Sequence, residues 1–182
     1  SKTIKNKNIL KLNNKELIYY SIKFAQKLRF LDKIIFSSDS SRYLKIAKEH
    51  GSKNLHKRSI NLSQDNSLTY DLVKEIYEEE LKNGNNFNLI LILQPTSPFR
   101  DLKTFIKAYK ILTKKKYDTV LSVREVKDHP ERMKKFSKKN GKIDNYLDLS
   151  VESLKPRQKL NKLYIRSGSM YFFKSDNLKK YD

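Results

Sequence analysis

Hydrophobic residues in this chain recur at a helical period in some segments and gather into short continuous runs in others. Leu17, Tyr20, Phe24 and Leu28 stand three or four residues apart, which predicts an amphipathic helix over about residues 15–29. Three more helices are predicted: one from Ser40 or Ser41 to the C′ residue Gly51, one over about residues 67–82, and one capped by Asp101.

Short apolar runs between these helices predict strands. The expected strands cover residues 32–39, 87–93, 118–126 and 164–173, whereas residues 55–62 look irregular. The run FNLILIL at 87–93 is almost continuously apolar, which is typical of a parallel strand covered on both faces. Strands that alternate with helices in this way predict an α/β fold with a mostly parallel sheet and right-handed crossovers.

The alternation breaks over residues 128–162. This segment is polar and rich in lysine, has few helical stripes, and contains Asn140-Gly141, which favours a hairpin. The chain of 182 residues has the length of one domain with a sub-lobe. We therefore interpret residues 1–182 as a single domain and residues 128–162 as an excursion inserted within it.

The formal net charge of +20 raises the possibility of a nucleic-acid partner. The basic residues are 32 lysines and 8 arginines, and they come with 15 asparagines and only 4 glycines. Biased codon usage explains this profile as well as phosphate binding does. Surfaces that read or stack on bases favour arginine with interleaved aromatic residues. Nucleic-acid binding is therefore an alternative and not the favoured interpretation.

Other features of the composition narrow the class of protein. The chain has no cysteine, which excludes disulfides and thiolate metal sites. No apolar run approaches the ~20 residues of a membrane span, and no signal-peptide pattern is present. A soluble cytoplasmic protein without a membrane partner is expected.

Polar segments at strand ends are the first candidates for chemistry, because ligands of open α/β sheets bind at the carboxyl ends of the strands. Such segments are residues 37–40, residues 94–100 and the loop from Arg58 to Ser67. Half of the arginines lie in loops or at strand ends from which they could converge on an anionic ligand, unless their positions are incidental: Arg58, Arg100, Arg157 and Arg166.

Acidic residues and histidines are weaker candidates. Asp39 is an acidic residue at a strand end with a claim on Mg²⁺, although capping of the next helix is its favoured role. The three histidines are isolated in the sequence and are expected at the surface rather than as general bases: His50, His56 and His129.

Several motifs together resemble the CMP-N-acetylneuraminate synthetases (acylneuraminate cytidylyltransferases). The opening Ser-Lys with Lys-Asn at 7–8, then IIFSSDS, LILQPTSPFR, KPRQKL and YIRSGSMYF, follow the order and spacing of that family over essentially the whole chain. The resemblance implies a Rossmann-like three-layer sandwich of the nucleotide-diphospho-sugar transferase type. It also implies an enzyme that condenses CTP with a nine-carbon 2-keto sugar acid, releasing pyrophosphate with the help of Mg²⁺.

The resemblance assigns two groups of residues to the nucleotide. Lys2 and Lys7 are implied as the catalytic cations on the triphosphate, with Ser1 and Asn8 shaping the loop between them. The segment that contacts cytosine and ribose corresponds to Arg58, Ser67 and Thr69, although Ser67 has helix capping as an equal alternative.

A second set of residues is implied for the sugar acid: Gln94, Thr96, Ser97, Arg157, Arg166, Ser167 and Tyr171. In the family, the counterpart of Arg157 comes from the excursion of a partner subunit. The resemblance therefore implies a homodimer with shared active sites and makes residues 128–162 a dimerisation lobe.

The chain also departs from the family pattern. Ser167 stands where members commonly have asparagine, which leaves legionaminate, pseudaminate or another nonulosonate as alternative substrates. The QPTSP motif argues against the Kdo branch. The family's first strand, with the glycines of its phosphate loop, would precede Ser1, and its metal-binding aspartates would follow Asp182. No Mg²⁺ ligand is therefore assigned within the chain.

Overall fold

The computed structural model describes residues 4–59, 69–114, 117–147 and 156–179. The chain divides into two compact units, one of residues Ser1–Leu121 with Gly168–Asp182 and the other of residues Ser122–Ser167. Strands β6 (Thr119–Glu125) and β9 (Tyr164–Lys174) each run from one unit into the other. The predicted excursion at 128–162 falls within the second unit, and its role in dimerisation stays a prediction.

The four predicted helices all form: α1 (Leu17–Lys27), α2 (Ser41–Glu49), α3 (Thr69–Lys82) and α4 (Leu102–Lys114). Ser40 caps α2 by accepting a hydrogen bond from the amide of Tyr43 at 3.4 Å, and Gly51 follows with a φ of 89°. Asp101 caps α4 through the amide and hydroxyl of Thr104, both at 2.8 Å, and these hydrogen bonds lower the pKa of Asp101.

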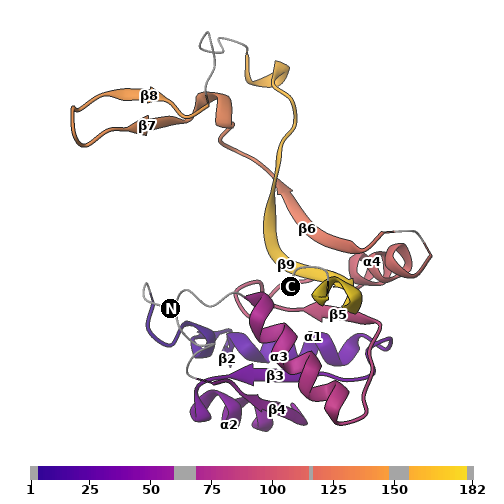
Figure 1. Cartoon of the computed structure of the whole chain (residues 1–182). Helices are drawn as coiled ribbons and strands as arrows, with labels where there is room; N and C mark the ends of the chain where they lie inside the picture. Colours follow the sequence, from indigo (N-terminus) through magenta and orange to yellow (C-terminus); the bar gives the residue numbers. More distant parts are fainter. Residues whose placement is uncertain (1–3, 60–68, 115–116, 148–155, 180–182) are drawn as a thin grey trace. The chain divides into compact units, whose positions relative to one another are not determined.

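Besides a short N-terminal hairpin, the described strands of the first unit form two separate sheets (Figure 1). β3 (Ile35–Ser38) pairs in parallel with β4 (Asn54–Lys57), so the prediction of irregular structure at 55–62 is wrong for residues 55–57. The other sheet has the order β5-β9-β6, and β5 (Leu89–Ile92) pairs antiparallel with β9. The expected mostly parallel sheet is therefore a mixed one, since a continuous apolar run indicates burial but not the direction of the neighbouring strand.

The main core lies between the sheet and helices α1 and α4. It gathers Phe24, Leu28, Phe105, Ala108, Leu112, Met170 and Phe172. Phe172 is only 1% exposed and lies in a stack with Phe30 and Tyr109, whose rings are 4.3 Å apart. This packing fixes β9 against α1 and α4, and so fixes the loops that leave the strand ends.

A short hairpin connects the N-terminal loop to α1. Strands β1 (Lys11–Leu12) and β2 (Lys15–Glu16) pair antiparallel through Asn13 and Asn14, whose positive φ values of 48° and 60° suit a two-residue hairpin turn. Glu16 accepts a hydrogen bond from His50 at 2.8 Å, which ties the hairpin to the end of α2. The N-terminal loop is thereby held against the first unit.

The pair of Glu16 and His50 predicts a pH-dependent contribution to stability. The pKa of Glu16 is lowered by a backbone hydrogen bond of its own and by its hydrogen bond with His50. A lowered folded-state pKa stabilises the fold above the unfolded value and loses that contribution as pH falls through the folded value. Glu16→Gln should therefore lower the free energy of unfolding by roughly 0.5 kcal/mol at neutral pH. Thermal melts of both proteins from pH 7 to pH 3 should converge at the acid end; a constant difference would contradict this assignment.

The second unit carries a lysine-rich hairpin. Strands β7 (Lys134–Phe136) and β8 (Ile143–Asn145) pair antiparallel, and Gly141 turns the chain between them with a φ of 67°, as Asn140-Gly141 predicted. Short 3-10 helices lie on either side: η3 (Pro130–Arg132) and η4 (Arg157–Lys159). Within the described parts of the chain, no helix is long and apolar enough to cross a membrane.

Candidate functional site

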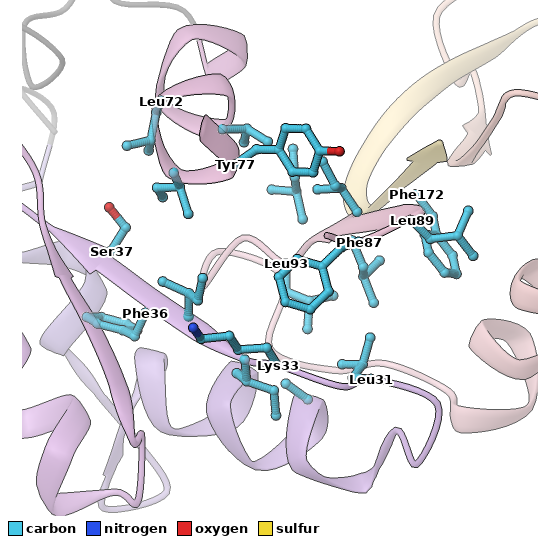
Figure 2. Close-up of a pocket in the computed structure, with 18 of the residues that line it drawn as sticks. Leu31, Lys33, Phe36, Ser37, Leu72, Tyr77, Phe87, Leu89, Leu93 and Phe172 are labelled. Atoms are coloured by element: carbon cyan, nitrogen blue, oxygen red, sulfur yellow. The ribbon is translucent and has the colours of Figure 1, made fainter. Parts of the chain in front are cut away.

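A cavity of about 1040 Å³ lies in the first unit, between β3 and β5 and lined by α1 and α3. Figure 2 shows side chains from α3, from the β3 segment and from the β5 segment around the same space. The middle of the cavity is apolar, with Phe36, Leu72 and Leu93 in its wall. Its polar lining includes residues at the carboxyl ends of β3 and β5, where ligands of α/β sheets bind.

The carboxyl end of β3 contributes Ser37, Ser38 and Asp39 to this lining. Asp39 does not cap α2, because Ser40 does, so the favoured role predicted for Asp39 is wrong. The Asp39 carboxylate instead accepts a long hydrogen bond of 3.4 Å from the Ser38 hydroxyl. The backbone carbonyl of Asp39 accepts a hydrogen bond from the Lys57 ammonium. The carboxylate thus lines the cavity with most of its hydrogen-bonding capacity left for a ligand.

Arg58 lies one residue beyond the end of β4 and also lines the cavity. Its amide donates to the carbonyl of Ser38 at 3.0 Å, and its Nη2 donates to the carbonyl of Ser37 at 3.5 Å. The Nε atom is buried, yet no acceptor for it is found among the described residues. A buried donor without an acceptor raises the free energy of the folded state, so the Arg58 guanidinium is a candidate to bind an anionic or carbonyl group.

Gln94 leaves β5 at the mouth of the cavity, followed by the proline-bounded loop of the QPTSP motif. The loop is a turn in which the amide of Ser97 donates to the carbonyl of Gln94 at 3.2 Å. Within the described residues, the side-chain amide of Gln94 has no hydrogen-bond partner. A half-buried amide that faces a cavity in this state is a candidate for ligand binding.

Arg100 does not contribute a cation to the site. Its guanidinium donates to Gln94, Ser21 and Ser169, and burial lowers its pKa to about 10. The hypothesis that Arg58, Arg100, Arg157 and Arg166 converge on one anion is therefore wrong for Arg100, because Arg100 does not line the cavity and protein acceptors already use three of its five N–H donors.

The N-terminal loop reaches the same end of the cavity. Lys7 begins the 3-10 helix η1 (Lys7–Ile9), and Asn8 lines the cavity. Asn6, with a left-handed φ of 57°, accepts a hydrogen bond from the hydroxyl of Tyr43 at 3.2 Å. The loop is thus fastened to α2, and the Lys7 ammonium forms no ion pair with a described residue.

Two of the three histidines are not the isolated surface residues that were predicted. The His56 side chain is 12% exposed, with Nδ1 3.0 Å from the Ser37 hydroxyl and Nε2 3.4 Å from a Glu75 carboxylate oxygen. His50 is held by Glu16, as described above. The positions of their partners, 19 and 34 residues away, leave no local signal in the sequence.

The predicted site residues that the structure describes fall into three groups. The cavity brings together Asn8, Arg58, Thr69 and Gln94. Four others lie in the first unit outside its lining: Lys7 at the start of η1, Thr96 and Ser97 in the QPTSP loop, and Tyr171, which pairs with Ile92 on β5. The second unit contains Arg157, Arg166 and Ser167. The remaining predictions, Ser1, Lys2 and Ser67, lie outside the described residues.

Gly168 is a site residue whose role the sequence analysis missed. It has a φ of 74°, and a β-carbon placed on it would lie 3.0 Å from Oε1 of Gln94 and 4.0 Å from the hydroxyl of Ser97. A glycine inside a predicted strand commonly marks a close approach of another group, which is the signal that could have identified it.

No group of three or more histidine, aspartate and glutamate side chains is arranged to hold a metal ion among the described residues. At the carboxyl end of β3, the cavity is lined by the single carboxylate of Asp39. Mg²⁺ is often bound through one or two carboxylates together with substrate phosphates, so Asp39 fits a partial site of that kind.

Comparisons with known proteins find relatives along most of the chain. The N-acylneuraminate cytidylyltransferase of Escherichia coli O18:K1:H7 is 34% identical over 155 residues, which are 85% of this chain and 34% of that protein. The "Post-translational flagellin modification protein B" of Campylobacter coli is 28% identical over 183 residues, covering 100% of this chain and 76% of that protein. A Helicobacter pylori protein named for pseudaminic acid cytidylyltransferase and a hydrolase is 30% identical, covering 99% of this chain and 34% of that protein. The chain thus spans about a third of the length of two of these relatives.

The fold has a counterpart among solved structures. A CMP:2-keto-3-deoxy-manno-octonic acid synthetase complexed with CTP matches with a TM-score of 0.67, covering 98% of this chain and 71% of that chain. The sequence identity is 13%, so this likeness concerns the fold, which is that of a nucleotidyltransferase. A family model described as Cytidylyltransferase matches residues 1–181. Because this match covers almost the whole chain, the chain belongs to the cytidylyltransferases, a family of nucleotidyltransferases.

Proposed function

We propose that the protein transfers CMP from CTP to a nine-carbon 2-keto sugar acid. The observation that carries this proposal is the meeting of Asn8, Arg58, Thr69 and Gln94 around one cavity. The first three were predicted for the nucleotide and Gln94 for the sugar acid, from segments up to 86 residues apart (94 − 8). A cavity that gathers both sets can hold a nucleotide and an acceptor side by side.

The reaction requires specific groups around this cavity. The anomeric oxygen of the sugar acid attacks the α-phosphorus, the bond to pyrophosphate breaks, and the hydroxyl proton leaves the acceptor. Cations near the triphosphate stabilise the charge that develops on the leaving pyrophosphate. Lys7, at the start of η1, is proposed for this role together with Lys2. Arg58 and Thr69 hold the nucleoside, so that the acceptor can attack in line.

Mg²⁺ is proposed as the cofactor, by analogy with cytidylyltransferases in general. It supplies positive charge to the triphosphate when bound. The Asp39 carboxylate could hold it together with the substrate phosphates.

We propose that residues beside Gln94, most of them outside the cavity lining, determine which sugar acid binds. Gln94 is proposed to contact the acceptor with Thr96, Ser97 and Tyr171. Relatives named for N-acylneuraminate and for pseudaminic acid are both about 30% identical to this chain, so both acids are candidate substrates. Legionaminate is a third, because Ser167 supplies a hydroxyl where an amide is common in the family. Kdo is disfavoured by the QPTSP motif.

We propose that the second unit mediates a homodimer. Phe136 and Ile143 face each other across the β7–β8 ladder and are 63% and 65% exposed, and Tyr146 beside them is 59% exposed. A surface hairpin with an apolar pair of this kind is stabilised when a partner covers it. In the proposed dimer, Arg157 of one subunit completes the sugar site of the other.

A cytoplasmic location stays a prediction.

A coupled assay for pyrophosphate tests the proposed function. The protein, with the sequences that flank residues 1–182, should release pyrophosphate from CTP only with Mg²⁺ and a nine-carbon keto acid. The acids to compare are N-acetylneuraminate, legionaminate, pseudaminate and Kdo. Turnover with Kdo alone, or without any acid, would overturn the substrate assignment. Binding to mixed oligonucleotides that weakens steeply with salt, without stabilisation by CTP, would favour a nucleic-acid-binding protein instead.

Arg58→Met should raise the KM for CTP about tenfold and leave the KM for the sugar acid within about twofold, since the substitution removes donors proposed for the nucleotide alone. Methionine keeps the apolar stem but none of the N–H groups. Arg29→Met, at an exposed position, is the matched control. Equal changes in both KM values would show that Arg58 supports the fold instead of the nucleotide.

A further inference from the structure

The guanidinium of Arg100 joins three separate parts of the first unit. Nη2 donates to the carbonyl of Gln94 at 2.5 Å, Nη1 to the hydroxyl of Ser21 in α1 at 3.1 Å, and Nε to the carbonyl of Ser169 in β9 at 3.2 Å. The group also lies over the ring of Phe24, 5.8 Å from its centroid. A planar guanidinium, whose N–H groups point in several fixed directions, can donate to three acceptors placed in this way. The more compact ammonium of a lysine would not reach all three.

Two of the three acceptors of Arg100 are backbone carbonyls next to the Gln94 side chain. One is the carbonyl of Gln94 itself, and another belongs to Ser169, the residue after Gly168. Gly168 in turn borders Oε1 of Gln94, and a β-carbon at this position would lie only 3.0 Å from that oxygen. The Gln94 side chain therefore lies between a backbone that Arg100 fixes on one side and a strand that Arg100 fixes on the other.

We propose that Arg100 is a positioning residue for the Gln94 amide, and hence a determinant of sugar-acid binding. The proposal rests on the proposed function, in which Gln94 contacts the sugar acid. Arg100 itself does not touch the substrate, because its donors are directed at Ser21, Gln94 and Ser169. It holds the QPTSP loop and β9 at the separation that the Gln94 amide needs, while α1 serves as the fixed support through Ser21.

The test compares Arg100→Met with the exposed control Arg29→Met in the pyrophosphate assay. Arg100→Met keeps the stem over Phe24 and removes all three hydrogen bonds. The KM for the sugar acid should rise about tenfold or more, and the KM for CTP should change less than about twofold. Gly168→Ala provides an independent variant, because its methyl group would lie 3.0 Å from Oε1 of Gln94 and push that oxygen aside without removing a bond of Arg100. Alanine is also strained at the φ of 74°, so the melting temperature is measured alongside, and the variant should give the same selective rise.

The outcomes separate positioning from a general structural role. A purely structural role lowers the melting temperature and alters both KM values together, or neither, and would overturn the proposal. If Arg100→Met does not fold, Ser21→Ala decides the question. This variant removes one acceptor, so a selective rise of about two- to threefold in the sugar-acid KM supports positioning, and no rise overturns it.

Failure of the proposed function is recognised separately. If the unsubstituted protein turns over no keto acid, the substrate assignment fails, and the positioning of Gln94 is then measured by amide hydrogen exchange. The amides of Gln94, Thr96 and Ser97 should exchange at least about tenfold faster in Arg100→Met than in Arg29→Met, with the amides of α1 unchanged. Equal exchange in the two variants would overturn the positioning role as well.

Discussion

Lys7→Met should lower kcat about 100-fold or more while the affinity for CTP changes little. The proposed role of Lys7 is to stabilise charge that appears on the leaving pyrophosphate, so its contribution is larger in the transition state than in the bound substrate. Removal of one such preorganised donor typically costs about 100- to 1000-fold in rate. A factor of 100 corresponds to about 2.7 kcal/mol of transition-state stabilisation. Steady-state kinetics with saturating sugar acid, together with a CTP binding titration, measure both quantities.

The control for this experiment is a neighbouring lysine. Lys5→Met removes the same charge two residues away, at an exposed position, and should leave kcat within about twofold. If both variants lose activity equally, the general positive charge of the loop matters and Lys7 has no special role. If neither does, the triphosphate lies elsewhere and the assignment of η1 to it fails.

The elements were largely predictable because their signals are local. The four helices show their apolar stripe and caps in consecutive residues, as Ser40 and Asp101 illustrate. β4 was missed because the four residues Asn54–Lys57 carry no apolar run, and the parallel ladder with β3 makes them a strand. The direction of β9 against β5 was likewise invisible, since strand direction depends on the tertiary connection and not on composition.

The site was predictable only as far as its residues fall within family motifs. Motifs located Asn8, Arg58, Thr69 and Gln94, which the fold then brings to one cavity. Hydrogen bonds between side chains and partners far away in the sequence could not be predicted. Arg100, although part of LILQPTSPFR, was considered for an anion when its donors in fact serve Ser21 and Ser169, 79 and 69 residues away. Three-dimensional proximity alone distinguishes an arginine that binds a ligand from one that supports a loop.

Gln94→Glu should raise the KM for the sugar acid about 100-fold or more, with the KM for CTP and the melting temperature nearly unchanged. The substitution is isosteric, so it keeps the packing beside Gly168, and it places a negative charge where the proposed substrate carries a carboxylate. Two like charges about 4 Å apart repel by about 4 kcal/mol at an effective dielectric constant near 20. Even a fraction of that energy exceeds what loss of one neutral hydrogen bond would cost, which is about 0.5–1.5 kcal/mol.

Two further variants make this result specific to charge. Gln94→Met removes the amide without adding a charge and should raise the sugar-acid KM by only about tenfold, so the ratio between the two variants isolates the repulsion. Gln26→Glu adds the same charge on the exposed side of α1 and should have no selective effect. If Gln94→Glu and Gln94→Met behave alike, the substrate carboxylate is not near Gln94. The carboxylate of the acid would then bind elsewhere, and this result would contradict the proposed arrangement of nucleotide and acceptor around the cavity.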